Sequence, residues 1–280
     1  MIPAYNAEKF LSATVASVFA QTVPPDEVIV VDDGSTDGTP ALLQSLREVY
    51  PLRVITKQNG RQARARNDGI AAARGEFVAL LDHDDLWHPT KLERQLDQLV
   101  ADPSLGVCFT AVNLIRDGTE EVACLESWNP DPAAALQRLL TGCAVATPSA
   151  VIARREVLAR VAFDERLKPY GADWLAWLEM AATGVRIGYL PEPLVRYVKH
   201  ETNLTYSASY HEVGSNVMDR FFQKHPEVPS GRYWRARWHL RAAENGDGRR
   251  HLLKAALAHP RSIRPGWVRV AFMTSGGGAI

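Results

Sequence analysis

The chain has 280 residues, of which 46% are hydrophobic and 23% charged, so its composition is that of a globular protein and not of a disordered or collagen-like one. No run approaches the roughly 18 consecutive apolar residues that a membrane-spanning helix needs. The formal net charge is +0, but residues 1–140 hold 12 basic and 20 acidic residues, so the first half is acidic and the second basic.

The cysteine content predicts reduced thiols. Cys108, Cys124 and Cys143 are odd in number and lack a CxxC spacing, which argues against both a disulfide framework and a zinc site. The first residues contain no basic segment followed by an apolar stretch, so no secretion signal is expected. We therefore predict a cytoplasmic protein.

Residues 1–103 alternate between helical and strand-like apolar periods, as is typical of a βαβ chain with a parallel sheet. Four apolar residues end the run 27–31, which predicts a strand buried on both faces. The predicted elements are a helix over 10–19, a strand over 27–31, a helix over 40–49, a strand over 52–56, a helix over 62–74, a strand over 76–81 and a helix from Pro89.

The pattern becomes mixed after residue 104, and beyond about 205 it is helical and basic. The fold class is therefore α/β, a Rossmann-like sheet with helices on both faces, and we expect three parts: 1–103, 104–205 and 206–280. The further predicted elements are strands over 106–115, 119–125, 148–153 and 185–190, and helices over 132–140, 154–161 and 172–182.

Ligands of open α/β sheets bind beyond the carboxyl ends of the strands, and an acidic cluster follows the strand 76–81. Carboxylates gathered there repel one another unless a cation holds them. Asp82 and Asp84 thus predict a hard-oxygen site for Mg²⁺ or Mn²⁺, shared with the phosphates of a nucleotide. The alternative is that Asp84 or Asp85 only caps the following helix. His83 is a metal ligand or a bystander.

A second acidic pair, Asp32 and Asp33, follows the strand 27–31. Its carboxylates accept hydrogen bonds from a nucleobase or ribose, or they cap the helix near Pro40. The short stretch from residue 61 to residue 66 is rich in arginine, whose fork-shaped side chain suits phosphate. The arginines are Arg61, Arg64 and Arg66, and the alternative for each is a solvated helix face.

Phosphate-cradling motifs of other families are absent from the sequence. No GxGxxG follows the first strand, and neither GxxxxGK[ST] nor GxSxG occurs, which argues against a dinucleotide-dependent dehydrogenase, a P-loop enzyme and an α/β-hydrolase. Several runs instead resemble family 2 glycosyltransferases of the GT-A fold. They include Ile2-Pro-Ala-Tyr-Asn6, Glu27-Val-Ile-Val-Val-Asp-Asp-Gly-Ser-Thr-Asp-Gly38, Ala65-Arg-Asn67, Leu81-Asp-His-Asp-Asp-Leu-Trp87 and Gly171-Ala-Asp-Trp-Leu-Ala-Trp-Leu178.

The resemblance implies a metal-dependent inverting transfer from a nucleotide-diphosphate sugar, with a UDP-sugar expected, to a carbohydrate or lipid-linked acceptor. Residues 1–103 would bind the donor and 104–205 the acceptor. Asp84, Asp82 and His200 are the implied metal ligands, and Asp173 is the implied general base. The implied nucleotide-sugar contacts are Pro3, Tyr5, Asp32, Asp33, Arg61, Arg66, Asp82 and His83. The alternative for Asp173, which lies at a helix start before Trp174, is that it only caps the helix.

Two departures from the family pattern affect these expectations. The residue before Asp173 is Ala172, where the family has Glu, so the acceptor chemistry differs. Family members carry several apolar residues before the equivalent of Ile2-Pro3, so we expect either a truncated start or a short first strand here. A competing hypothesis follows, in which the chain is a non-catalytic nucleotide-sugar-binding protein of the same fold. Retention of Asp33, Asp82, Asp84 and Asp173 counts against it.

The basic tail allows two interpretations. Arginines interleaved with aromatic residues suit an anionic membrane surface, which predicts peripheral contact with the cell membrane beside its acceptor. Alternatively, the tail is a helical hairpin that packs its tryptophans inward. No recognised nucleic-acid-binding module accompanies the charge, so no nucleic acid partner is expected. The aromatic residues of this stretch are Tyr233, Trp234, Trp238, Trp267 and Phe272.

Overall fold

The structure is a computed structural model that describes residues 1–116, 118–167, 170–199, 209–244 and 248–259. Its backbone contacts define two compact units. The first consists of Met1–Glu165 and Ala176–Asn203, and the second of Arg166–Leu175 and Leu204–Ile280. This grouping does not test what each part binds, so the three-part functional division at residues 103 and 205 stays a prediction.

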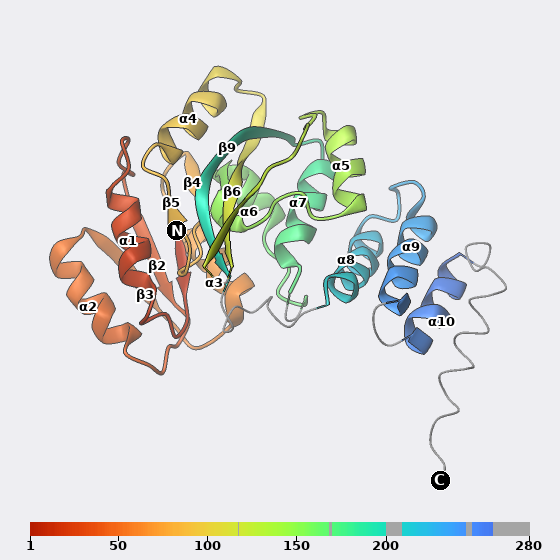
Figure 1. Cartoon of the computed structure of the whole chain (residues 1–280), viewed down its shortest axis with the longest axis horizontal. Coiled ribbons are helices and arrows are strands. Elements are labelled where there is room, and N and C mark those ends of the chain that lie inside the picture. Colours follow the sequence, from red (N-terminus) through yellow and green to blue (C-terminus); the bar gives the residue numbers. More distant parts are fainter. Residues whose placement is uncertain (117, 168–169, 200–208, 245–247, 260–280) are drawn as a thin grey trace, which may run out of the picture. The chain divides into compact units, whose positions relative to one another are not determined.

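The first unit begins with a three-stranded parallel sheet in the order β1-β2-β3 (Figure 1). Its strands are β1 (Ile2–Ala4), β2 (Val28–Asp32) and β3 (Leu52–Thr56). Every residue of β2 is buried, as its continuous apolar run predicts. The first strand has three residues.

Helices cover both faces of this sheet because alternate residues of β2 point to opposite sides. Val28 and Val30 join a cluster with residues of α1 (Leu11–Phe19) and α2 (Thr39–Val49). Ile29 and Val31 pack instead against Ala65 of α3 (Arg61–Ala72). The predicted two-sided burial is therefore confirmed.

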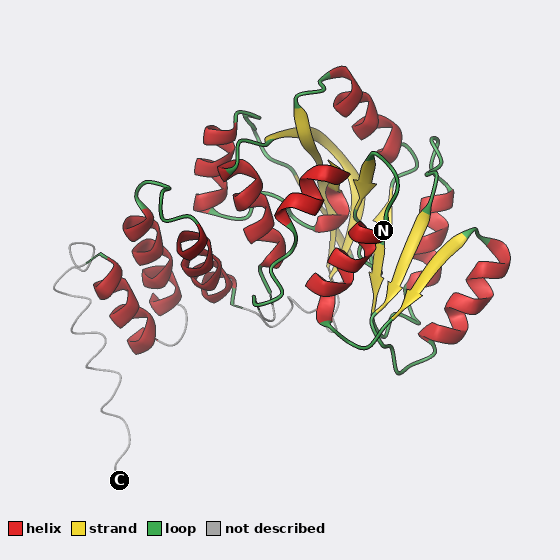
Figure 2. Cartoon of the chain, turned by 180° about the vertical axis from the view of Figure 1, so that it is seen from behind, coloured by secondary structure: helices red, strands yellow, loops and turns green. Residues whose placement is uncertain are grey.

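A second sheet of six strands has the order β4-β8-β6-β9-β5, and β7 pairs with β6. The Leu81 N–H donates to the Met1 carbonyl at 3.1 Å, so backbone pairing continues from β1 toward this sheet. In the first unit, strands lie inside and helices outside (Figure 2). The strands are β4 (Phe77–Ala79), β5 (Leu86–Trp87), β6 (Leu105–Arg116), β7 (Thr119–Ala123), β8 (Val151–Arg154) and β9 (Arg186–Lys199).

The helices of this region are α4 (Lys91–Ala101), α5 (Pro132–Thr141), α6 (Arg155–Val161) and α7 (Ala172–Ala182). One predicted element is corrected. Residues Pro148–Ala150 form a short 3₁₀ turn before β8, and not the beginning of a strand over 148–153, because the Ala150 N–H bonds back to the Thr147 carbonyl.

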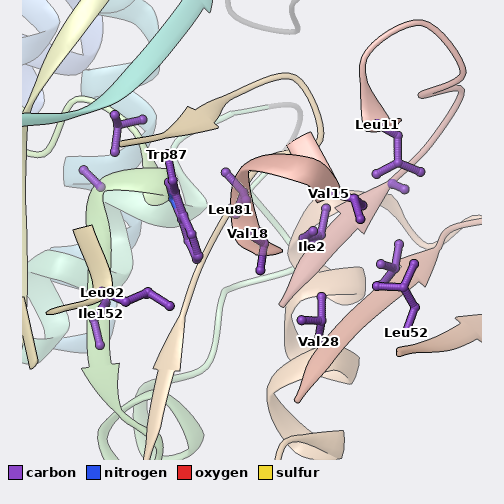
Figure 3. Close-up of a cluster of buried hydrophobic side chains, with 14 of the residues drawn as sticks. Ile2, Leu11, Val15, Val18, Val28, Leu52, Leu81, Trp87, Leu92 and Ile152 are labelled. Atoms are coloured by element: carbon purple, nitrogen blue, oxygen red, sulfur yellow. The ribbon is translucent and has the colours of Figure 1, made fainter. Parts of the chain in front are cut away.

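The main core connects the two sheets (Figure 3). Ile2, Val28 and Leu52 from the first sheet share one buried cluster with Trp87 and Ile152 from the second sheet and with Leu81, which follows β4. The Trp87 indole N–H donates to the Ser149 carbonyl at 2.9 Å, which satisfies its polar atom inside this core. Because side chains from both sheets pack in this one core, the ends of β1 and β4 are held next to each other.

The second unit contains α8 (Tyr210–Lys224), α9 (Gly231–Glu244) and α10 (Gly248–Ala258). Gly214 lets α8 and α9 approach, since a Cβ there would lie 2.4 Å from the Trp238 ring. Trp238 and Trp234 are buried, so neither is presented to a lipid surface. Trp267 and Phe272 lie outside the described residues. Among the described residues, no helix has the length and apolar character to span a membrane.

Candidate active site

The two acidic loops flank the end of β1. The Asp33 N–H donates to the Ala4 carbonyl at 2.8 Å, which ties the first loop to β1. On the other side, His83 Nδ1 lies 3.3 Å from the Pro3 carbonyl oxygen. Both acidic clusters therefore lie beside the end of β1, one in contact with Ala4 and the other with Pro3.

The carboxylates of the first loop are buried and shape the loop itself. Asp32 Oδ1 accepts the Ser35 N–H at 3.0 Å, and Asp33 Oδ1 accepts the Gly60 N–H at 2.8 Å. Lys57 Nζ lies 3.5 Å from the same Asp33 oxygen. Neither carboxylate makes a capping bond to α2, whose Thr39 N–H is bonded by Asp37 instead.

Backbone conformation around this loop depends on glycine. Gly34 has a φ of +76°, and a Cβ there would lie 2.8 Å from the Asn59 backbone nitrogen, so only glycine fits. Tyr5 is 44% exposed, and Arg61 is also exposed, at the first residue of α3. Both predicted donor contacts are thus accessible to a ligand.

The second loop is held by an ion pair that the sequence does not predict. Arg66 Nη2 lies 2.6 Å from Asp82 Oδ1, and Gln62 Nε2 lies 3.4 Å from the same oxygen. The Arg66 guanidinium also lies 5.5 Å from the centre of the Phe163 ring. Arg66 is 4% exposed, so this predicted phosphate partner is already engaged with a predicted metal ligand.

Asp85 is fully buried and turns away from α4. Its Oδ2 accepts the hydroxyls of Ser149 at 2.5 Å and Thr147 at 3.1 Å, and its Oδ1 accepts the Val198 N–H at 3.3 Å. Burial raises the pKa of the Asp85 carboxyl well above its usual range, and the charges of Asp84 and Asp82 raise it further. The helix-capping alternative therefore does not apply to Asp85.

The acidic loop fits a divalent cation in its donor set. Both side-chain hydrogen bonds of Asp82 reach Oδ1, so Oδ2 remains available, and Asp84 is a partly exposed carboxylate two residues away. Among the described residues, no three His, Cys, Asp or Glu side chains are grouped to hold a metal. A cation here therefore requires further oxygen ligands from a diphosphate or from water, as Mg²⁺ sites commonly do.

Asp173 belongs to the second unit and is the second residue of α7. Its Oδ1 accepts the Trp174 N–H at 2.8 Å, so the carboxylate lies in the first turn and not at the N-cap position. A negative charge is favoured there by the helix dipole. Ala172 is buried at the helix start, and His200 lies outside the described residues.

Asn67 is a further site residue to which the sequence assigns no role. Its amide donates to the Phe163 carbonyl at 2.9 Å and accepts the Phe163 N–H at 2.8 Å, which fixes the segment before residue 165 on α3. In the sequence, the only signal for Asn67 is that it belongs to the Ala65-Arg-Asn67 run that resembles the family. Ser149 and Thr147 carried no sequence signal, because their pairing with Asp85 is made across the fold.

Comparison with known proteins agrees with this geometry. The family model described as "Glycosyl transferase family 2" matches residues 1–162, more than half of the chain. The chain belongs to glycosyl transferase family 2, and the predicted enzyme class, a glycosyltransferase, is confirmed.

Curated relatives carry related names. The chain is 33% identical over 220 residues to an uncharacterized glycosyltransferase of Nostoc sp., a match covering 75% of this chain and 66% of that protein. It is 35% identical over 188 residues to the putative teichuronic acid biosynthesis glycosyltransferase TuaG of Bacillus subtilis, covering 65% and 71%. The chain thus spans about two thirds of the length of these relatives.

Solved structures show the same fold. S. aureus TarS 1-349 in complex with UDP-GlcNAc has a TM-score of 0.70 at 22% identity, covering 88% of this chain and 72% of that one. The mannosyltransferase PcManGT from Pyrobaculum calidifontis, in complex with GDP-Man and Mn²⁺, has a TM-score of 0.59 at 22% identity, covering 98% and 78%. The predicted GT-A fold is therefore confirmed.

Proposed function

We propose that this chain transfers a glycosyl group from a nucleotide-diphosphate sugar to an acceptor hydroxyl, with inversion at the anomeric carbon and with Mn²⁺ or Mg²⁺. The observation that carries the proposal is that both acidic loops contact the end of β1, one at Ala4 and the other at Pro3. One loop offers groups for a nucleoside, and the other offers carboxylates for a cation on the diphosphate.

A UDP-sugar is the proposed donor. Tyr5 and Arg61 are exposed and so are accessible to the donor. Asp32 and Asp33 are buried, so we propose that they contact only the nucleoside, at the surface of their own loop. The fold neighbour TarS was solved with UDP-GlcNAc, and PcManGT with GDP-Man and Mn²⁺. Asp82 and Asp84 would hold the cation, and His200 is the proposed third ligand.

The chemistry is a single displacement. Asp173 removes the proton from an acceptor hydroxyl, and the oxygen attacks the anomeric carbon from the face opposite the diphosphate. A new C–O bond forms as the bond to the diphosphate breaks, so the configuration inverts. When bound, the cation neutralises charge that develops on the diphosphate. Ala172 supplies no carboxylate beside the base, so Asp173 acts without a neighbouring Glu.

The proposed acceptor is a carbohydrate or lipid-linked sugar in surface polysaccharide synthesis. The relative named for teichuronic acid biosynthesis supports this class. We also propose that the basic tail contacts the membrane surface, through the arginines of α9 and of the sequence that follows it. Buried Trp234 and Trp238 do not contribute to such contact.

A donor-hydrolysis assay tests the proposal. The protein is incubated with UDP-, GDP- and dTDP-sugars, with and without Mn²⁺, and the release of nucleoside diphosphate is measured. We expect release from one donor class only, dependent on the cation and lost in Asp84→Ala. Nucleotide-sugar binding without turnover, in the presence of candidate acceptors, would favour the non-catalytic binding protein instead.

A further inference from the structure

Ser149 lies at the position that would pair with Asp82 if the antiparallel ladder of β4 and β8 continued. The register pairs Phe77 with Arg154 and Ala79 with Ile152, and the Leu80 N–H still bonds to the Val151 carbonyl at 3.1 Å. Continued by the same register, this ladder places Ser149 opposite Asp82.

The main chain of Ser149 does not complete the ladder in the usual way. Its carbonyl already accepts the Trp87 indole N–H at 2.9 Å. The Asp82 N–H bonds instead to the Ser149 hydroxyl oxygen, at 2.9 Å. A side chain thus replaces a backbone group at the residue that begins the acidic loop.

Asp85 fixes the direction of that hydroxyl. A serine hydroxyl has one hydrogen to donate and lone pairs that accept. Because Ser149 donates its hydrogen to Asp85 Oδ2 at 2.5 Å, its lone pairs remain for the Asp82 N–H. Asp85 and Ser149 are both 0% exposed, so water does not supply an alternative donor or acceptor. The same Asp85 carboxylate holds the Val198 N–H of β9 at 3.3 Å.

We infer that Asp85 is a positioning residue for the cation: through the Ser149 hydroxyl it sets the backbone of Asp82, and with it the direction of the Asp82 and Asp84 carboxylates. The inference rests on the proposed function, because it concerns the cation that the acidic loop would hold. It adds Asp85 and Ser149, which touch neither donor nor cation themselves. Partners that orient metal ligands in this way commonly affect metal affinity 10–100-fold.

The test measures Mn²⁺ affinity directly, by electron paramagnetic resonance titration in the presence of UDP, together with the thermal midpoint of each variant. In Asp85→Asn an amide NH₂ can face Ser149, so the hydroxyl no longer has its acceptor. In Ser149→Ala the link is missing. We expect Mn²⁺ affinity to fall at least tenfold in both variants. The double variant should bind Mn²⁺ no less tightly than the single variant with the lower affinity, because both changes break the same connection.

Thr147→Val is the matched control. It also removes a hydroxyl from Asp85 Oδ2, at 3.1 Å, and an acceptor from the Ser149 N–H, at 3.2 Å, but it leaves the Ser149 hydroxyl in place and Thr147 has no bond to Asp82. Its Mn²⁺ affinity should stay within twofold, even where its thermal midpoint falls as much as that of Ser149→Ala. If Asp85→Asn fails to fold, Ser149→Ala against Thr147→Val decides the question.

The results of this titration distinguish failure of the positioning role of Asp85 from failure of the proposed metal dependence. Wild-type protein that binds Mn²⁺ with UDP, beside variants that bind it within twofold of wild type, would overturn this inference alone. An equal loss in Thr147→Val would also overturn it, since general destabilisation would then explain the effect. Wild-type protein that binds no Mn²⁺ with UDP would overturn the proposed metal dependence and this inference with it.

Discussion

Arg66 Nη2 lies 2.6 Å from Asp82 Oδ1, and this ion pair connects α3 to the acidic loop after β4. The side chains are 5% and 15% exposed, so each charge depends on the other for compensation. Arg66 binds one carboxylate oxygen of Asp82 and so fixes the orientation of that carboxylate. Arg66 thus acts on the predicted metal ligand through a direct bond.

We expect Arg66→Met to lower the free energy of unfolding by about 3 kcal/mol, because it leaves the Asp82 carboxylate without its counter-charge. Urea unfolding without added metal measures this. Mn²⁺ with UDP should restore part of the loss, since a cation at Asp82 replaces the missing charge. Arg64→Met on the same helix is the control, because Arg64 is exposed and should change stability by about 0.5 kcal/mol or less. Equal losses at both positions would show that the ion pair contributes nothing special.

Asp173→Asn should lower turnover roughly 10²–10⁴-fold, the usual contribution of a general base. The amide oxygen can still accept the Trp174 N–H, so α7 should begin as before. Donor affinity, measured by calorimetry with UDP, should therefore stay within about twofold. Asp97→Asn, on the exposed side of α4, is the matched control and should retain full turnover. Turnover of Asp173→Asn within a few-fold of wild type would assign the base elsewhere.

The first sheet could be predicted from the sequence because its signals are local. The apolar run of β2 and the capping residues after it locate β2, α2 and β3 within one or two residues. β5 escaped prediction because its two residues, Leu86 and Trp87, have no period of their own and are held by pairing with Arg196 and Val195. β9 runs past the predicted end at 190 to Lys199 for the same reason, since β6 supplies its partner along that length.

The candidate site was predictable in its residue types but not in its connections. The acidic clusters stand at strand ends, which sequence order shows directly. That Arg66 faces Asp82 and that Asp85 faces Ser149 depends on how α3 and β8 pack, which no spacing reveals. The neighbouring aspartates differ for this reason: Asp82 is partly exposed and pairs with Arg66, whereas Asp85 is buried and bonded to Ser149 and Thr147.

A buried lysine at the start of α4 predicts an unusual pH dependence of the free energy of unfolding. Lys91 is 0% exposed, with Nζ 2.6 Å from Gln95 Oε1 and 4.5 Å from the centre of the Trp87 ring. Burial lowers its pKa to about 7. The unfolded chain, with an ordinary lysine pKa of about 10.4, binds more protons across this window, so the free energy of unfolding should rise from pH 7 to pH 10.

Lys91→Met should remove that rise and increase the free energy of unfolding at pH 7 by about 2 kcal/mol, after the loss of the bond to Gln95 is counted. At pH 10 the gain should disappear. Urea unfolding at both pH values measures it, with Lys9→Met as the control, because Lys9 is exposed. A stability that does not depend on residue 91 between these pH values would mean that the buried amine keeps its charge at little cost.

Asp219 of α8 connects this helix to α9 and α10. Its Oδ1 lies 3.0 Å from His239 Nε2 and 2.9 Å from Arg235 Nε, and its Oδ2 lies 3.2 Å from Lys254 Nζ. His239 is buried and its Nδ1 lies 3.0 Å from His251 Nδ1. Burial opposes ionisation of Asp219, but bonding and charge from His239, Arg235 and Lys254 outweigh it, so the pKa of this carboxyl lies well below its ordinary value.

Asp219→Asn should therefore lower the free energy of unfolding at pH 7 by about 2 kcal/mol, since His239 and Lys254 lose their anionic partner. A depressed carboxyl pKa stabilises the folded state above the unfolded value near 3.9, and this contribution is lost as the pH falls toward the folded value. The stability of the wild type should thus fall more steeply than that of the variant below about pH 5, and the two curves should converge. Tryptophan fluorescence reports the transition, because Trp234 and Trp238 are buried in the same unit. Glu244→Gln makes the same charge change at an exposed end of α9 and should leave the curve unchanged. Parallel curves for wild type and Asp219→Asn down to pH 4 would contradict a stabilising role for the ionised carboxylate.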